Sequence, residues 1–490
     1  MSNTTISILF LLIYTIGLIA VGLWNRKSEN SEAYFLASRS LPPWLLAITF
    51  IASWWGGGTA VDLVDHAHFI GLSAFWIYGA PVLLATALMF LFAKGIRNVG
   101  TVSQPQLMSE RYNDKVSLFL TIFIIIFMVL NTAVQIIVVG KFFEAFFDMS
   151  YESGAILGTL IVFTYSLFGG FKGVVVTDLL QFVFFLFTGV FLFILAYTQS
   201  GGIEAVKATA IANDKVGFTS IFTNVSDKMA YIITFGTSWM IQANIWQRIS
   251  AARKAVDAKK MMIYSFLAFI PLYLMVVYTG VFSSVLYPTI PKSGIVPTMI
   301  SSLSNPYLSA LLFVGLCSAI MSTMDSLINT GALSLTVDIF QKHINPEASA
   351  KVNVFVGRFS TLLVSAVALF IALRIRSFLT IAWIGSDFLT SGAFIPLVLG
   401  FLWARGTSKA ALVSMMFGLL FSTYNLLIAF GLNLPSAWDV ASAKQAIIGI
   451  LGSLILFVGI SFFTKGDIEK SRRFINKAGV MNRRGKKLRK

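Results

Sequence analysis

Long apolar stretches, each about the length that crosses a bilayer, follow one another along nearly the whole chain. A helix needs roughly 20 apolar residues to span about 30 Å of hydrocarbon. The pattern predicts an all-α integral membrane protein with about thirteen transmembrane helices. The stretches cover residues 5–25, 42–64, 70–95, 116–146, 153–170, 173–198, 228–247, 261–288, 306–338, 353–375, 378–403, 409–432 and 443–464.

The two ends of the chain complete this organisation. Residues 1–5 carry no Lys or Arg, and the apolar run that follows is long for a signal peptide, so we expect an uncleaved helix over 5–25. No polar stretch is long enough for a globular domain. We therefore predict one transmembrane domain over residues 1–465 and a basic tail over 466–490.

The charge distribution sets the expected orientation. The net charge is +16, yet only 12% of residues are charged, about half the share in soluble proteins. Most of the basic residues, including Arg26, Arg248 and Lys260, fall on the side of the tail. By the positive-inside rule we expect a multi-pass plasma (inner) membrane protein with its N-terminus outside and its C-terminus in the cytoplasm.

This topology accounts for the basic excess, so the expected partner is the lipid bilayer and no nucleic acid. The terminal segment Arg483–Lys490 either contacts anionic lipid head groups or stays solvated as an anchor.

One predicted helix carries a run of glycines near the middle of the membrane. The segment reads Trp54-Trp55-Gly56-Gly57-Gly58-Thr59. Consecutive glycines favour an unwound backbone, and free carbonyls at this depth are tolerated only where they line a cavity or bind a ligand. Glycine-interrupted helices at the midplane are typical of transporter binding sites. The alternative is close helix packing through small residues, which are usually spaced by four rather than adjacent.

Three carboxylates stand inside apolar stretches, namely Asp178, Asp325 and Asp387. An ionisable group in hydrocarbon costs roughly 3 kcal/mol, so each is a functional candidate. The alternative for each is a satisfied helix cap or an interhelical hydrogen bond.

A row of hydroxyl groups accompanies Asp325. Ala319, Ser322, Thr323 and Ser326 share one helix face, because they are spaced by three and four residues. Oxygen ligands without His or Cys suit a small, hard cation. The alternative is that these hydroxyls bond to their own helix and hold neighbouring helices together.

Residue types needed for catalysis are scarce. The chain has one cysteine, three histidines and no nucleotide-binding glycine loop. His66 and His68 stand beside Asp62 and Asp65 at the expected outer end of a helix, where we predict gate residues rather than a zinc site. We predict no enzyme, no organic cofactor and no metal other than a coupling ion. Asp62 is the member of this cluster most suited to face a solute.

Four segments resemble the solute:sodium symporter family over roughly residues 5–465. They are Ala33–Pro42 before the glycine break, Gly169–Asp178, Trp246–Arg253, and Ala319–Ser326 with Thr336–Ile339 after it. The resemblance implies a leading helix (5–25), an inverted 5+5 helix core with broken helices (about 42–403), and two terminal helices (409–464).

The resemblance also implies the ion sites. A sodium ion would bind the backbone carbonyls of Ala52, Trp55 and Ala319 and the hydroxyls of Ser322 and Thr323. A second cation, or the exit path of the first, would use Asp178, Asp325 and Ser326, together with Ser322.

The implied function is a sodium-coupled symporter that takes up a small organic solute by alternating access. The alternative is a proton-coupled or uncoupled carrier with Asp178 and Asp325 as a proton relay. The break and Ser386-Asp387 resemble the choline-transporting branch of the family. Gln242 and Leu84, however, stand where that branch is expected to have aromatic residues. The identity of the solute therefore stays open. The candidate solute contacts are Trp54, Gly56, Thr59, Asp62, Tyr78, Gln242, Asn244 and Asp387.

Overall fold

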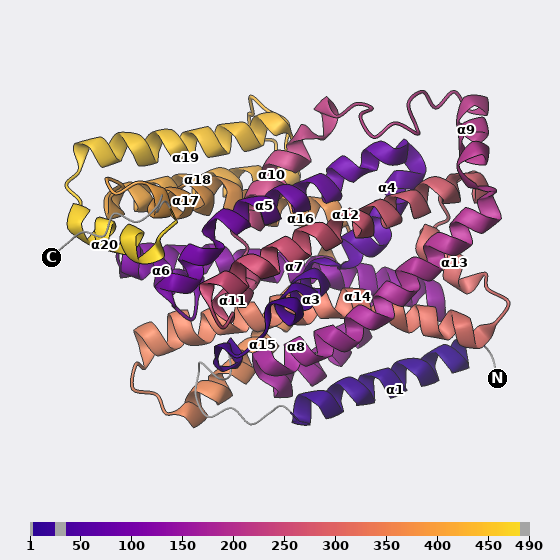
Figure 1. The fold of residues 1–490 in the computed structure, drawn as a ribbon, viewed down its shortest axis with the longest axis horizontal. Helices are drawn as coiled ribbons and strands as arrows, with labels where there is room; N and C mark the ends of the chain where they lie inside the picture. Colours follow the sequence, from indigo (N-terminus) through magenta and orange to yellow (C-terminus); the bar gives the residue numbers. More distant parts are fainter. Residues whose placement is uncertain (1–2, 25–35, 481–490) are drawn as a thin grey trace.

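The computed structural model describes residues 3–24 and 36–480, and the regular structure in this range is helical (Figure 1). All thirteen predicted stretches lie on helices, which confirms the all-α membrane class. Ten helices among the described residues are long and apolar enough to span a membrane, so the count of thirteen spans stays a prediction. Nine of these spans correspond to the long helices α1 (Asn3–Trp24), α5 (Phe75–Val99), α7 (Asp114–Phe147), α8 (Tyr151–Ser200), α12 (Ala255–Leu286), α14 (Pro306–Leu333), α15 (Ala350–Arg374), α18 (Ser408–Ala429) and α19 (Ala443–Phe463). The tenth, Phe378–Leu402, is built from shorter pieces.

Shorter helices form the breaks and the ends of the bundle. They are α3 (Pro43–Trp54), α4 (Leu63–Ile70), α6 (Gln104–Arg111), α9 (Gly202–Ala212), α10 (Met229–Met240), α11 (Ala243–Ser250), α13 (Ile295–Ser301), α16 (Phe378–Phe388), α17 (Phe394–Leu402) and α20 (Ile468–Ala478). Short segments of tighter or wider helix lie between them at η1 (Ala37–Arg39), η2 (Gly58–Asp62), η3 (Gly71–Ala74), η4 (Ser226–Lys228), η5 (Ser334–Ile344) and η6 (Leu389–Ala393).

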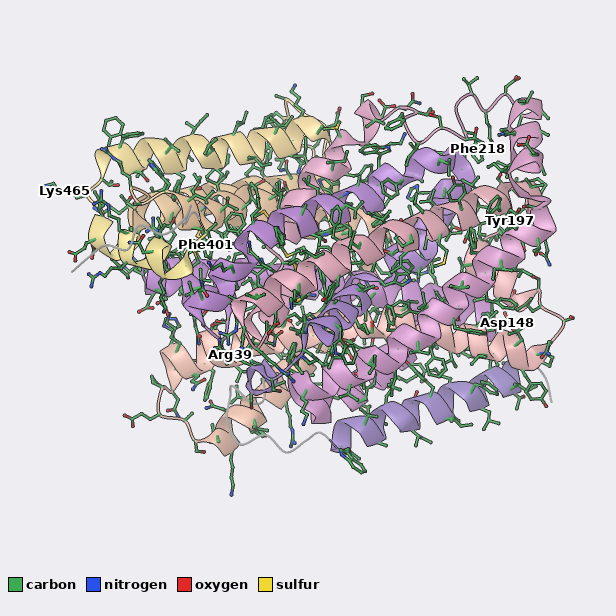
Figure 2. The ribbon with its side chains drawn as sticks, in the orientation of Figure 1. Arg39, Asp148, Tyr197, Phe218, Phe401 and Lys465 are labelled. Atoms are coloured by element: carbon green, nitrogen blue, oxygen red, sulfur yellow. The ribbon has the colours of Figure 1, made fainter. Side chains whose placement is uncertain are left out.

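The long helices lie side by side along the longest axis of the molecule (Figure 1). One end carries α6 and α20 and is called the α20 end; the other carries α9 and α13 and is called the α13 end. Lys465 marks the α20 end, and Asp148 and Phe218 mark the α13 end (Figure 2). Figure 1 also places α1 and α19 at opposite edges of the bundle.

Helix α14 is the centre of the bundle. Every residue from Leu312 to Leu333 is buried, and the helix contacts α1, α3, α7, α8 and α15. Protein therefore surrounds the hydroxyl row and Asp325 on all sides, which spares these polar groups the cost of facing lipid.

Helix α8 is traced as one element of 50 residues, where the sequence predicts two spans. Its residue Tyr165 hydrogen-bonds the carbonyl of Met321 at 3.2 Å, and Thr188 packs directly against Gly315. A straight helix would separate Tyr165 from Thr188 by about 35 Å, but their partners on α14 are only about 9 Å apart along that helix. The chain must double back between them, which agrees with two antiparallel spans.

The predicted break lies where the glycines stand. Helix α3 ends at Trp54, and Trp55 leaves the helical conformation (φ −86°, ψ 56°). The chain then resumes through η2 into α4, which continues to Ile70, beyond the predicted boundary at residue 64.

The predicted stretch over 228–247 is also broken. Helix α10 ends at Met240, Ile241 and Gln242 leave the helix, and α11 starts at Ala243. No glycine marks this second break, so composition gave no signal for it. The inverted relation between the two halves of the core stays a prediction.

The first part of the predicted tail, residues 468–478, forms the helix α20. Helix α20 packs against α5, α6 and α17, and its Ser471 hydroxyl accepts from Arg111 at 2.7 Å. Burial lowers the pKa of Arg111, and its guanidinium donates its other hydrogen bonds to carbonyls around the end of α17. The basic segment Arg483–Lys490, like Arg26 and Ala33–Phe35, lies outside the described residues.

Candidate functional site

A cavity lies at the glycine break, between α3, α5, α7, α10, α14 and α16. It encloses about 600 Å³ free of protein atoms, counting its open side. Six aromatic residues line it, and no charged side chain of the described residues does. The aromatic lining consists of Trp54, Tyr78, Phe235, Trp239, Tyr273 and Phe378; the polar lining consists of Ser53, Thr59, Asn131, Gln135, Gln242, Thr323 and Ser386.

The three glycines of the break are required by close contacts rather than by an unusual backbone. A Cβ atom on Gly56 would lie 2.6 Å from the Gln135 amide oxygen and 2.9 Å from the Thr323 hydroxyl. A Cβ atom on Gly58 would lie 2.7 Å from the Phe378 ring. The glycines therefore let the cavity walls and the hydroxyl row of α14 approach the unwound backbone.

Stacked rings form one wall of the cavity. The rings of Phe235 and Trp239 are parallel, with centroids 4.8 Å apart, and Tyr78 stacks on both. The Trp54 indole N–H donates to the Gln242 amide oxygen at 2.5 Å. This hydrogen bond joins the two helix breaks across the cavity.

The opposite wall is polar and comes from α7. The Gln135 amide oxygen accepts from the Gly57 N–H at 2.9 Å and so occupies one backbone donor that the break exposes. Asn131 lies one turn earlier on the same face. Neither residue is among the predicted site residues, although two amides spaced by four in an apolar stretch indicate a polar helix face.

The predicted sodium ligands come together where α3 ends. The Ser322 hydroxyl lies 2.6 Å from the Ala52 carbonyl oxygen, and the Thr323 hydroxyl lies 3.3 Å from it. The Thr323 hydroxyl is also 3.4 Å from the Ala319 carbonyl oxygen. Trp55 and Ala319 line one neighbouring small cavity. These hard oxygen donors converge from two helices, as a small hard cation requires.

The second predicted set contains a residue that the sequence analysis placed elsewhere. Arg248 was counted among cytoplasmic charges, but its side chain is 1% exposed. Its Nη2 lies 3.1 Å from Asp178 and donates to the Ser326 hydroxyl at 2.8 Å, and its Nε donates to Thr49 at 3.1 Å. Thr49 also donates to Asp178. A guanidinium group thus already binds two of the four predicted ligands, Asp178 and Ser326.

Asp325 stands beside this ion pair and is fully buried. One of its carboxylate oxygens lies 3.4 Å from the Ser326 hydroxyl, and the other has no hydrogen-bond partner among the described residues. Asp325 and Asp178 together outnumber the single charge of Arg248, so the cluster carries an excess negative charge when both carboxylates are ionised.

The two ends of the cavity differ. A large hollow at the α13 end is lined by Asp62, Asp65, Lys141 and other residues, and Phe378 borders both this hollow and the central cavity. Toward the α20 end, the Gln104 amide donates to the Ile241 carbonyl at 2.9 Å among several layers of buried polar contacts. The layer of protein that closes the cavity is therefore thin toward the α13 end and thick toward the α20 end.

The acidic and histidine cluster lies along that hollow. The Tyr78 hydroxyl donates to Asp62 at 3.0 Å, and His66 lies 3.4 Å from the same carboxylate. Asp65 accepts from the Ile295 N–H at the start of α13, at 2.8 Å. His68 instead hydrogen-bonds Ser283 and is buried.

Two predicted solute contacts do not line the cavity. The Asn244 side chain is buried, and its amide has no hydrogen-bond partner among the described residues. The Asp387 carboxylate accepts from Ser391 and from Asn425 on α18, on the far side of α16. Of the other candidates, Trp54, Gly56, Thr59, Tyr78 and Gln242 line the cavity, and Asp62 lies behind Tyr78.

Two relatives in sequence are sodium/proline symporters. The sodium/proline symporter of Staphylococcus aureus (strain Newman) is 28% identical over 493 residues, covering 92% of each chain. The sodium/proline symporter of Escherichia coli (strain K12) is 26% identical over 436 residues, covering 83% of this chain and 85% of that one.

Solved structures share the fold. The substrate-bound outward-open state of a Na+-coupled sialic acid symporter matches with a TM-score of 0.80 at 17% identity, covering 94% of this chain and 98% of that one. The nucleobase-cation-symport-1 family transporter Mhp1, in a closed conformation, matches with a TM-score of 0.61 at 12% identity, covering 90% and 97%. The pattern of the sodium:solute symporter family matches residues 34–418, and this protein therefore belongs to that family.

Proposed function

We propose that this protein is a sodium-coupled symporter that takes up a small organic solute by alternating access. The observation that carries the proposal is the convergence of the Ala52 and Ala319 carbonyls with the Ser322 and Thr323 hydroxyls, directly beside the central cavity. Family membership and the sodium-coupled relatives support sodium as the coupling ion.

Sodium at this site would connect the end of α3 to α14. Thr323 contributes to the ion site and also lines the solute cavity, so the two ligands share a wall. An ion that holds α3 against α14 stabilises the arrangement in which the cavity is formed. Coupling follows because sodium then binds one state of the carrier with a more favourable free energy than the other.

The α13 end is the outer side in this proposal, and the N-terminus lies outside. The hollow at that end would admit sodium and solute past Phe378, while the contacts around Arg248 and Gln104 close the cytoplasmic side. Release inward would require these contacts to open. The relatives suggest L-proline as the first solute to test.

The test is uptake into proteoliposomes that contain the purified protein. An inward sodium gradient should drive accumulation of radiolabelled L-proline, or of another solute selected by its stabilisation of the protein. A potassium gradient of equal size should not drive it, and an imposed pH gradient should not replace sodium. Accumulation driven by the pH gradient alone would overturn the proposal in favour of proton coupling.

A further inference from the structure

A buried carboxylate lies directly behind the wall of the solute cavity and takes no part in the function proposed above. Ser386 lines the cavity, and Asp387 follows it on α16 but points toward α18 and α19. Asp387 is 2% exposed and forms no ion pair within the described residues. A buried charge without a counter-charge is costly, so the residues around it decide whether it persists.

Four neutral groups surround this carboxylate. The Ser391 hydroxyl donates to one oxygen at 3.1 Å, and the Asn425 amide donates to the other at 3.2 Å. The Ser422 hydroxyl and the Gln445 amide nitrogen lie close by and have no hydrogen-bond partner among the described residues. All four side chains are buried.

The loop between α18 and α19 fixes which way the two amides point. The Trp438 indole N–H donates to the Asn425 oxygen at 2.9 Å, and the Ala441 backbone N–H donates to the Gln445 oxygen at 2.7 Å. Indole and backbone N–H groups can only donate. The two amide oxygens are therefore occupied by these N–H donors, and the Asn425 NH₂ group faces Asp387.

A shell of donors stabilises the carboxylate and excludes a cation from this position. Hydrogen bonds from NH₂ and hydroxyl groups favour the ionised form of an acid. A bound cation would instead need free oxygens that point inward, and both amide oxygens already accept from N–H groups of the α18–α19 loop. The two hydrogen bonds from Ser391 and Asn425 offset part of the cost of burying this charge.

We propose that Asp387 is a specificity-determining residue, whose fixed negative charge behind Ser386 makes the cavity select solutes that carry a positively charged ammonium group. This inference rests on the proposed function and extends it to a substrate class. The cavity itself has no charged lining, and Asp62 stands behind Tyr78 on another wall, so carboxylates flank an aromatic cavity from two sides. Aromatic faces attract ammonium groups as well.

The expected size of the effect follows from helix dimensions. Side chains on one helix are separated by no more than its width of about 10–12 Å, so a solute at Ser386 lies within about that distance of Asp387. One charge acting over about 10 Å at the effective permittivity of protein interiors changes a binding constant by about tenfold. Removing the charge should therefore weaken the binding of ammonium solutes by about tenfold and leave the binding of analogues without the ammonium group unaffected.

The test uses pairs of probes that differ only in charge. Choline is compared with 3,3-dimethylbutan-1-ol, in which carbon replaces nitrogen, and L-proline with tetrahydrofuran-2-carboxylate, in which oxygen replaces the ammonium. Binding to purified protein in saturating sodium is measured by isothermal titration or thermal stabilisation. In at least one pair, the ammonium member should bind the wild type more tightly than its analogue.

Three variants decide the role of Asp387. Asp387→Asn should weaken the binding of the ammonium probe about tenfold and leave the binding of its analogue unchanged. The double variant Asp387→Asn with Asn425→Asp moves the charge by one hydrogen bond and should restore most of the affinity. Asp439→Asn removes an exposed carboxylate of the α18–α19 loop and is the control.

Several results would overturn the assignment. Equal weakening of the binding of both members of a pair by Asp387→Asn would overturn it, because equal weakening indicates a structural role only. No preference for the ammonium member in either pair, including the case in which neither member binds, also rejects it. The readout is equilibrium binding, so a failure of sodium-driven uptake would reject the proposed function without producing either of these results.

Discussion

Replacing Ser322 by alanine is the sharpest perturbation of the sodium site. The Ser322 hydroxyl lies 2.6 Å from the Ala52 carbonyl oxygen, the shortest contact between α14 and the end of α3 in that site. The substitution removes one oxygen and adds no bulk. Thr323→Val removes the second hydroxyl, whose contacts are longer, at 3.3 and 3.4 Å, and keeps the shape of the side chain.

The magnitude separates an ion ligand from a structural hydrogen bond. A neutral hydrogen bond between helices in a membrane contributes about 0.6 kcal/mol on average. Loss of a direct sodium ligand should cost more than about 1.4 kcal/mol, which is a tenfold weakening. We expect Ser322→Ala to raise the half-saturating sodium concentration at least tenfold, and Thr323→Val to raise it by a similar or smaller factor.

Two measurements are made on each variant. Sodium-dependent uptake gives the half-saturating concentration, and the midpoint of thermal unfolding without sodium reports any structural loss. Sodium should stabilise the wild type in proportion to the logarithm of its concentration above the dissociation constant, and the variants only at higher concentration. Cys317→Ala is the control, because Cys317 is buried on the same helix but lies near Tyr14 of α1. An unchanged half-saturating concentration in both Ser322→Ala and Thr323→Val would refute this cation site.

Three further predictions follow from other parts of the molecule. Asp178→Asn leaves Arg248 buried without its charge partner, so the midpoint of thermal unfolding should fall by an amount that corresponds to about 3–5 kcal/mol. Adding Arg248→Gln should recover most of this loss. An unchanged midpoint in the single variant would contradict the ion pair. Gly56→Ala would place a methyl group 2.6 Å from an amide oxygen of the cavity and 2.9 Å from a sodium-site hydroxyl, so solute and sodium binding should both weaken at least tenfold, as measured by titration; wild-type affinities would show that the cavity adapts. A reporter inserted in the loop 213–227 should read external and one fused at the C-terminus cytoplasmic, and finding both on one side would reject the proposed orientation.

Much of the candidate site could be predicted because polar groups in hydrocarbon are costly and therefore conspicuous. The glycine run marked a helix end, and the hydroxyl row marked the face of α14 that meets it. The resemblance to the family is confirmed, and it paired the Ala52 carbonyl with Ser322 across 270 positions of sequence. No local pattern contains a pairing over such a distance.

Other parts of the site had weak or misleading signals. The break before Ala243 contains no glycine, since its exposed backbone groups are accommodated by neighbours such as Gln104. The sequence pattern predicted a cytoplasmic charge at Arg248, because this residue follows an apolar stretch. In the fold it pairs with Asp178 from a different helix. Asp387 was predicted to contact the solute, because a lone carboxylate in a membrane segment suggests a functional role.

The sequence by itself determined the membrane class, the helical stretches, the first break and the chemistry available for a small cation. These features depend on hydrophobicity and residue type, which each segment carries alone. Only the tertiary structure decided which polar groups face one another. The direction of the Asp387 side chain, the orientation of the amides around it and the place of Arg248 depend on contacts between helices. A helix presents its residues in all directions, and packing alone selects which of them meet a cavity, a partner charge or lipid.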